Sequence, residues 1–170
     1  MNDSLEHFQT FVDSPLGALR LMATPAGLAG VWFVDRQRHE PAAKERDQWR
    51  KVTSHPVLDE TARQLGEYFS GRRQDFQLPM DLQRGTAFQQ AVWRALLEVP
   101  FGQTTRYGEL AQQLGRPLAS RAVGASVGRN PLAIVVPCHR VLGATGHLTG
   151  YAGGLDRKQA LLNLEMHLKD

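Results

Sequence analysis

The sequence predicts an α+β fold of two domains, with strands gathered at the start of the chain and helices towards its end. The 170 residues, of which 42% are hydrophobic, suffice for one domain of ordinary size or for two small ones with a buried core. Short runs of β-forming residues fill the first part of the chain, whereas apolar residues recur at helical spacing from position 86 onward. Strands followed by helices, rather than alternating with them, are typical of the α+β class.

Three short strands are predicted before residue 35. Residues 8–12, 18–23 and 28–34 are rich in β-branched, aromatic and other apolar side chains. Ser-Pro-Leu-Gly at 14–17 and Thr-Pro-Ala-Gly at 24–27 separate them, and both sequences favour turns. We therefore expect a small antiparallel meander.

A helix is predicted after the meander and a polar stretch. Leu58, Ala62, Leu65 and Phe69 recur at helical spacing. The helix is expected to end at Gly71, because glycine readily adopts the left-handed conformation that closes a helix.

The domain boundary is predicted where this periodicity stops. The segment from residue 72 has no clear period and contains Pro79, so we place a linker at about 72–85. The division is then an N-terminal structural domain of residues 1–80 and a second domain of residues 86–170.

The second domain is predicted to be mainly helical and to contain a helix-turn-helix. Thr86 and Gln89 form a capping box at the start of its first helix. Two short helices, at about 104–114 and 119–127, are joined by a glycine-containing turn. A last helix begins near Asp156.

Basic charge is concentrated in the second half of the chain. Residues 1–80 carry ten basic and eleven acidic side chains, whereas residues 81–170 carry ten and six. The net charge of +3 therefore arises entirely after residue 80. The excess fits either a solvated basic face or a surface that contacts a phosphate backbone.

The second helix of the predicted helix-turn-helix has an unusual composition. Residues 119–128 are nearly all small, and Gly124 stands in mid-helix at a cost of about 1 kcal/mol relative to alanine. Arg121 is the single long side chain. Such a helix either packs closely against another helix, with a solvated arginine, or approaches DNA closely and places one arginine where a flipped base has left the duplex.

The bulk sequence indicates a soluble cytoplasmic protein. No apolar stretch has the length of a bilayer span, and the first residues are polar and acidic, unlike a secretory signal. One unpaired thiol fits a reducing compartment.

Cys138 is the only cysteine of the chain, so it forms no internal disulfide and no cysteine-rich zinc site. It follows an apolar run and precedes His139 and Arg140. Free cysteines are often inert core residues, and a nucleophilic one needs a base or a positive environment. His139 can be the base and Arg140 can add positive potential or hold the backbone.

The base would itself need a carboxylate to orient it. Glu165 is the best placed, on an otherwise apolar part of the last helix, although a solvated position is the alternative. Since neighbouring residues of a strand point to opposite faces, Cys138 and His139 can meet only if the chain turns after Pro137. We expect a water relay between them.

Five short sequences follow one another in the second half of the chain: Arg121-Ala-Val-Gly, Asn130-Pro, Pro-Cys138-His-Arg, Tyr151-Ala-Gly-Gly and Leu161-Leu-Asn-Leu-Glu. Together they resemble the O6-alkylguanine-DNA alkyltransferases, also called methylated-DNA:protein-cysteine methyltransferases. The resemblance is dense over residues 86–168 and loose before residue 80. It implies a small ribonuclease-H-like α/β N-terminal domain and a winged-helix-like DNA-binding and active-site domain.

The resemblance implies direct reversal of DNA damage. The protein would bind duplex DNA through the minor groove, flip O6-alkylguanine out and transfer the alkyl group irreversibly to Cys138, once per molecule. O4-alkylthymine is a further candidate lesion. His139 would act as a water-mediated base oriented by Glu165, Asn130 would support the active-site turn, and Tyr107 would assist flipping and donate a hydrogen bond to the purine N3.

Further site residues follow from the same resemblance. Arg121 would be the intercalating finger. The other expected DNA contacts are Tyr107, Ala122, Gly124, Ser126 and Arg129. The expected pocket residues are Cys138, Arg140, Val141, Tyr151 and Ala152.

The resemblance also implies which cofactors, metals and partners to expect. We expect no cofactor and no zinc, because some relatives bind a structural zinc largely through cysteines that this chain lacks. DNA is the expected partner, no membrane contact is expected, and a monomer is the default, with cooperative binding along DNA left open. The rival functions are a DNA-binding module with an inert Cys138 and a cysteine hydrolase.

Overall fold

The computed structural model describes residues 6–168. Its N-terminal part is a four-stranded sheet in the order β3-β2-β1-β4. The strands are β1 (Phe8–Val12), β2 (Leu19–Thr24), β3 (Gly27–Phe33) and β4 (Arg50–Lys51). The first three form the predicted antiparallel meander, and β4 pairs parallel to β1. Strand β4 was not predicted, since two exposed residues give no periodic signal in the sequence.

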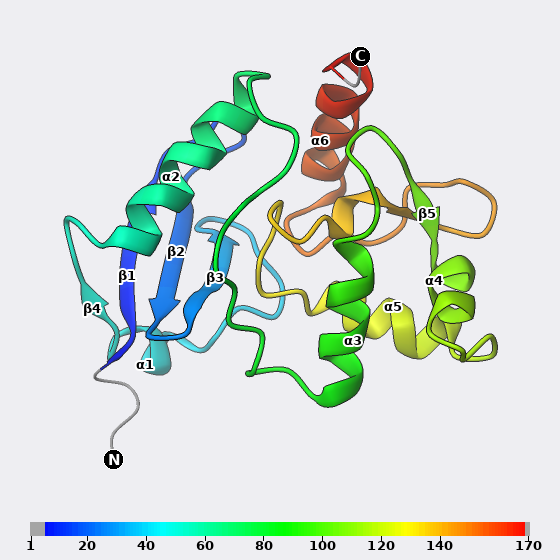
Figure 1. The fold of residues 1–170 in the computed structure, drawn as a ribbon, viewed down its shortest axis with the longest axis horizontal. Coiled ribbons are helices and arrows are strands. Elements are labelled where there is room, and N and C mark those ends of the chain that lie inside the picture. Colours follow the sequence, from blue (N-terminus) through cyan, green and yellow to red (C-terminus); the bar gives the residue numbers. More distant parts are fainter. Residues whose placement is uncertain (1–5, 169–170) are drawn as a thin grey trace.

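Helix α2 (Pro56–Phe69) packs on one face of this sheet (Figure 1). Its buried face includes Leu58, Leu65 and Tyr68, which join the main hydrophobic core. Gly71 has a φ of 81°, so the predicted left-handed residue after the helix is confirmed. A smaller cluster of Met22, Ala29, Trp32 and Trp49 lies apart from this core, next to the short α1 (Ala43–Arg46).

The predicted linker is tied to the sheet. The Leu28 amide donates to the Pro79 carbonyl at 2.8 Å, and the Asp81 amide donates to the Leu28 carbonyl at 2.8 Å. Further along β3, the Val31 amide donates to the Pro131 carbonyl at 2.8 Å. Segments from both halves of the chain therefore cover the outer edge of β3, and the main core contains residues of both halves.

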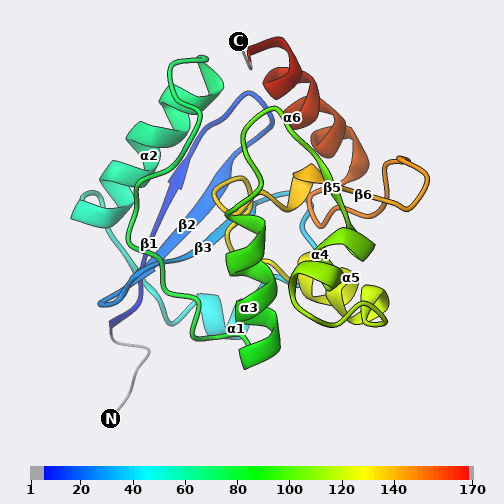
Figure 2. The ribbon, with the colours of Figure 1, turned by 45° about the vertical axis from the view of Figure 1, so that its right-hand side comes forward.

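The second half contains the predicted helix-turn-helix (Figure 2). It begins with α3 (Ala87–Leu96), which has the expected capping box of Thr86 and Gln89. Helices α4 (Tyr107–Gln113) and α5 (Ser120–Gly128) lie side by side. The first of them starts three residues later than predicted, because β5 (Thr105–Arg106) pairs in parallel with β6 (Val141–Leu142).

The last helix, α6 (Leu155–Leu168), packs against a 3₁₀ turn, η2 (Cys138–Arg140). Arg157 ties α6 to the N-terminal part: its guanidinium donates to the carbonyls of Leu16 and Arg36 and to the carboxylate of Asp35. Within residues 6–168, no helix is both long and apolar enough to span a bilayer.

Candidate active site

The chain turns directly after Pro137, as contact between Cys138 and His139 would require. Residues 138–140 form the 3₁₀ turn η2, and the preceding residues 132–136 are buried. Cys138 is 7% exposed and His139 is fully buried. The turn therefore places a thiol and an imidazole in the interior, beside α6.

Asn130 holds the segment that leads to this turn. Its side-chain amide donates to the carbonyl of Val136 at 2.8 Å and to that of Leu132 at 3.4 Å, and its Oδ1 accepts from the Leu132 amide at 2.9 Å. The residue is itself buried, so these bonds satisfy a polar group that would otherwise destabilise the fold. Asn130 thus fixes the backbone of the segment directly before the turn.

Glu165 lies at the centre of a buried hydrogen-bond network. Its Oε2 is 2.6 Å from His139 Nε2 and accepts from the Tyr68 hydroxyl at 2.7 Å. Its Oε1 accepts from Arg140 Nε at 2.7 Å and from the Gly102 amide at 3.4 Å. Glu165 is 1% exposed, so the solvated alternative is wrong.

The charges of this network fix the tautomer of His139. Burial raises the pKa of Glu165, but the hydrogen bonds and charges of His139 and Arg140 lower it to about 2, so the carboxylate is ionised at neutral pH. An ionised carboxylate only accepts hydrogen bonds, so His139 Nε2 carries a proton. Burial lowers the pKa of His139, which leaves Nδ1 as an acceptor, and Nδ1 has no protein partner within the described part of the chain.

The surroundings of Cys138 shift the pKa of its thiol in opposite directions. Burial raises the pKa of Cys138, whereas the Asn130 side chain and the positive charge of Lys158 lower it. Lys158 is fully buried on α6, and its ammonium donates to the Thr149 carbonyl at 2.8 Å. Burial lowers the pKa of Lys158 to about 8, opposed by the charge of Cys138. A thiolate at Cys138 would thus have a buried cation as its counterion.

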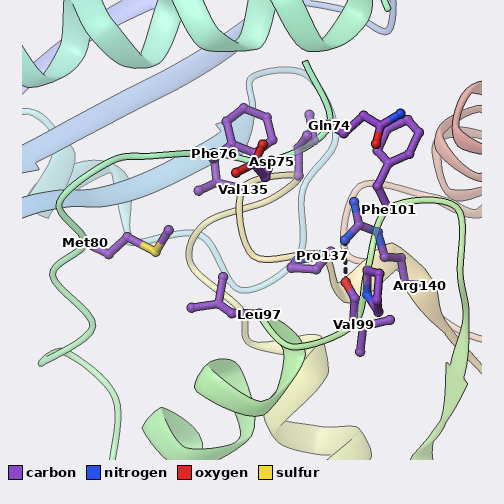
Figure 3. A pocket seen from close by; sticks show the side chains of 12 residues that line it. Gln74, Asp75, Phe76, Met80, Leu97, Val99, Phe101, Val135, Pro137 and Arg140 are labelled. Atoms are coloured by element: carbon purple, nitrogen blue, oxygen red, sulfur yellow. Dashed lines mark hydrogen bonds between the residues drawn. The ribbon is translucent and has the colours of Figure 1, made fainter. Parts of the chain in front are cut away.

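The Arg140 guanidinium is bound to a backbone carbonyl and to the Glu165 carboxylate, so it is not free to bind a ligand at Cys138. Its guanidinium donates to Glu165 and, at 2.6 Å, to the carbonyl of Val99. Figure 3 shows it beside Pro137 at a cavity of about 500 Å³. Cys138 is not among the residues that line this cavity, and the bonds of Arg140 to Val99 and Glu165 tie the turn to its surroundings.

Tyr151 and Ala152 belong to the loop before α6. Tyr151 is 8% exposed, its hydroxyl has no partner among residues 6–168, and burial, followed by the charge of Cys138, raises its pKa. The Ala152 carbonyl accepts from the Arg38 amide at 2.9 Å. Val141 is fully buried in β6, directly after the turn.

The exposed face of α5 carries only part of the expected DNA contacts. Arg121, Ala122 and Arg129 are exposed. Gly124 is half-buried, and a Cβ there would lie 3.6 Å from the Tyr107 ring, whereas Ser126 is buried at 4% exposure. Close helix packing thus explains Ser126, which we leave out of the proposed DNA contacts, whereas the contact of Gly124 with DNA stays a prediction.

Tyr107 opens α4, and its hydroxyl lies 3.0 Å from the Thr149 hydroxyl. Thr149 in turn offers its carbonyl to Lys158. The loop that carries Thr149 therefore joins the helix-turn-helix to the surroundings of the thiol.

Two family descriptions cover nearly the whole chain. Residues 8–82 match the ribonuclease-like domain of 6-O-methylguanine DNA methyltransferase, and residues 87–167 match the DNA binding domain of the same protein. The chain belongs to the 6-O-methylguanine DNA methyltransferase family.

Relatives in this family are similar over almost their full length. A methylated-DNA–protein-cysteine methyltransferase of Mycolicibacterium paratuberculosis is 52% identical over 155 residues, or 91% of this chain and 89% of that protein. The Mycobacterium tuberculosis O6-methylguanine methyltransferase structure has a TM-score of 0.84 at 43% identity and covers 95% of this chain and 93% of its own. A structure of Mycobacterium tuberculosis OGT in complex with DNA has a TM-score of 0.81 at 42% identity, covering 95% of this chain and 93% of its own.

Membership of the 6-O-methylguanine DNA methyltransferase family confirms the predicted α+β class and the ribonuclease-like N-terminal part. Two residues near the site were not predicted: Tyr68 of α2 contacts Glu165, and Lys158 of α6 lies near Cys138. Lys158 stands two turns before Glu165 on the same face of α6, a spacing that the sequence displays. Nothing in the sequence links Tyr68 to Glu165, which follows 97 positions later.

Proposed function

We propose that this protein repairs DNA by transferring an alkyl group from O6-alkylguanine to the thiol of Cys138. The observation that carries the proposal is the buried thiol next to a His139–Glu165 pair in a chain of this family. Neither the binding-only rival nor the hydrolase rival is favoured by an observation of its own.

The chemistry begins with the thiol proton. His139 Nδ1 accepts it through a water, and the imidazolium is stabilised by the ionised Glu165 at 2.6 Å from Nε2. Lys158 stabilises the thiolate. The sulfur then attacks the alkyl carbon in line, so that a carbon–sulfur bond forms while the bond between that carbon and O6 breaks.

The leaving group is guanine, which becomes neutral by gaining one proton. We assign that proton to Tyr107, whose hydroxyl would exchange its contact with Thr149 for one with the purine N3. Tyr107 then regains a proton from solvent, while His139 releases to solvent the proton that it took from the thiol. In the balance, one proton passes from the thiol to guanine and the alkyl group passes to sulfur. Tyr151, Val141 and Ala152 are the proposed walls of the pocket.

Binding to duplex DNA is assigned to the helix-turn-helix, with α5 at the minor groove. The exposed Arg121 and Ala122 on a helix of small residues support this, since such a helix approaches DNA closely and offers one long side chain to the gap left by a flipped base. Arg129, exposed at the end of α5, is the proposed phosphate contact. We propose a monomer as the binding unit.

The product limits each molecule to one reaction. A thioether has no ready hydrolysis route, and Cys138 is the only thiol of the chain. The protein is thus expected to be used up stoichiometrically by its substrate.

The test is to incubate the protein with duplex DNA containing O6-methylguanine and to map its peptides by mass. We expect one added methyl group on the Cys138 peptide, and none with Cys138→Ser, which should still bind the DNA. DNA binding without a methyl group on the wild-type peptide would overturn the proposal in favour of a lesion sensor.

A further inference from the structure

We propose that Tyr68, in the ribonuclease-like domain, is a positioning residue for alkyl transfer that fixes the carboxylate of Glu165 behind His139. The inference rests on the proposed function and extends it to the N-terminal domain, to which the sequence assigned no role in the chemistry.

The contact is direct and fully enclosed. The Tyr68 hydroxyl donates to Glu165 Oε2 at 2.7 Å, and the same oxygen lies 2.6 Å from His139 Nε2. Tyr68 is fully buried and Glu165 is 1% exposed, so water does not compete for this bond. A displacement of Oε2 therefore displaces the imidazole partner as well.

Tyr68 differs from the other hydrogen-bond donors to Glu165 in the oxygen atom that it contacts. Arg140 binds mainly Oε1, with a longer contact of 3.1 Å to Oε2, and the Gly102 amide also reaches Oε1. Besides His139 itself, Tyr68 makes the shortest contact to Oε2 among the described residues. Without its hydroxyl, the oxygen that orients His139 would keep only the contact with His139 itself and the longer contact with Arg140.

The ring of Tyr68 is held in place by other aromatic rings. It packs edge-on against Phe69 and Phe101, at centroid distances of 5.3 and 6.1 Å, and against Phe76 at 5.5 Å. A tyrosine buried in such a cluster needs a partner for its hydroxyl, and Glu165 is that partner. Burial and then the charge of Glu165 raise the pKa of Tyr68, so the hydroxyl stays protonated and always donates.

The segment after Tyr68 also rests on α6. A Cβ on Gly71 would lie 3.1 Å from the Leu168 side chain, and the Gln74 amide donates to the Leu168 carbonyl at 3.1 Å. The end of α2 and the segment that follows it therefore contact the end of α6, next to the bond between Tyr68 and Glu165. Through Tyr68 and Glu165, the N-terminal domain thereby influences His139, the proposed base, without contacting the substrate itself.

The variant Tyr68→Phe removes only the hydroxyl and keeps the ring. We expect the single-turnover rate of alkyl transfer to fall about tenfold, the loss of about 1.4 kcal/mol of transition-state stabilisation. The loss should be equal for methylated duplex DNA and for free O6-benzylguanine, with the dissociation constant for DNA unchanged. Phe76→Leu is the matched control, since it loosens the same aromatic cluster and keeps the hydroxyl; its rate should stay near that of the wild type.

Two further measurements separate positioning from mere stability. In the Glu165→Gln background, Tyr68→Phe should cost less than twofold in rate, because the carboxylate that it positions is gone. In the unreacted protein, the ¹⁵N signals of His139 should shift in Tyr68→Phe and stay in place in Phe76→Leu.

If folded Tyr68→Phe keeps the wild-type rate and the wild-type His139 signals, the inference is overturned. It is also overturned if Tyr68→Phe lowers the rate by the same factor with and without the Glu165 carboxylate. If the wild-type protein itself fails to alkylate Cys138, the proposed function fails. A shift of the His139 signals would then still establish that Tyr68 holds the imidazole partner, while removing its role in transfer.

Discussion

Replacing Glu165 by glutamine should remove a large, pH-dependent contribution to stability. The change keeps the shape of the side chain and deletes the charge that accepts from His139, Arg140 and Tyr68. The pKa of Glu165 is about 2 in the folded protein, against an ordinary value of 4.5. This difference corresponds to about 3 kcal/mol in favour of the folded state whenever the carboxyl is ionised in both states.

The sign follows from the direction of the shift. Because the folded pKa is depressed, the contribution is fully present above about pH 4.5 and is lost as the pH falls toward 2. The free energy of unfolding of the wild type should therefore exceed that of Glu165→Gln by about 3 kcal/mol at pH 7. The two free energies should converge in acid. Urea unfolding of both proteins at a series of pH values measures the difference.

The control is a carboxylate in contact with solvent. Glu60 also has a pKa lowered to about 2, by Arg63 and Gln64, but its side chain is 40% exposed, so its pairs are screened. Glu60→Gln should change the pH dependence of stability far less than Glu165→Gln. A constant difference between wild type and Glu165→Gln from pH 7 down to pH 2 would refute the reasoning about the buried network.

Three further predictions address the helix, the thiol and the turn. Arg121→Ala should slow repair of duplex DNA far more than the reaction with free O6-benzylguanine, and equal losses in the two rate measurements would contradict a role in base flipping. Lys158→Met should raise the pKa of the Cys138 thiol, so that capture by iodoacetamide reaches half of its maximal rate at a higher pH; an unchanged profile would contradict the counterion role. Asn130→Ala should lower stability by about 3 kcal/mol through its bonds to Leu132 and Val136, and the melting temperature by roughly 6–12 °C, whereas Gln159→Ala on the surface should not change it.

The elements with strong local signals were predicted correctly. The meander, α2, the capping box of α3 and the small-residue helix each depend on residues within a few positions of one another. The pairs β1–β4 and β5–β6 join strands far apart in sequence, with β4, β5 and β6 only two residues long, so no local pattern reveals them. The contact of Pro79 is also not visible in the sequence. Pro79 lies in a segment that looks like a free linker, but its carbonyl accepts a hydrogen bond from β3.

The site divides in the same way. Cys138, His139 and Glu165 could be proposed from the sequence because a lone thiol precedes an imidazole and because a carboxylate on an apolar helix face needs a partner, and the structure brings His139 and Glu165 into contact. Ser126 was wrongly predicted as a DNA contact, because a small residue looks the same in the sequence whether it faces DNA or a neighbouring helix. The contribution of Tyr68 depends on tertiary packing alone, since α2 and α6 meet only in the folded chain.

The most direct test of the central claim counts alkyl groups. Wild-type protein is mixed with an excess of duplex DNA whose O6-methylguanine carries a radiolabelled methyl group, and the label on protein is followed to its plateau. The account predicts one methyl group per molecule of protein, all of it on the Cys138 peptide and none in Cys138→Ser. A plateau at zero, label on another residue, or demethylation of more DNA than there is protein would contradict it.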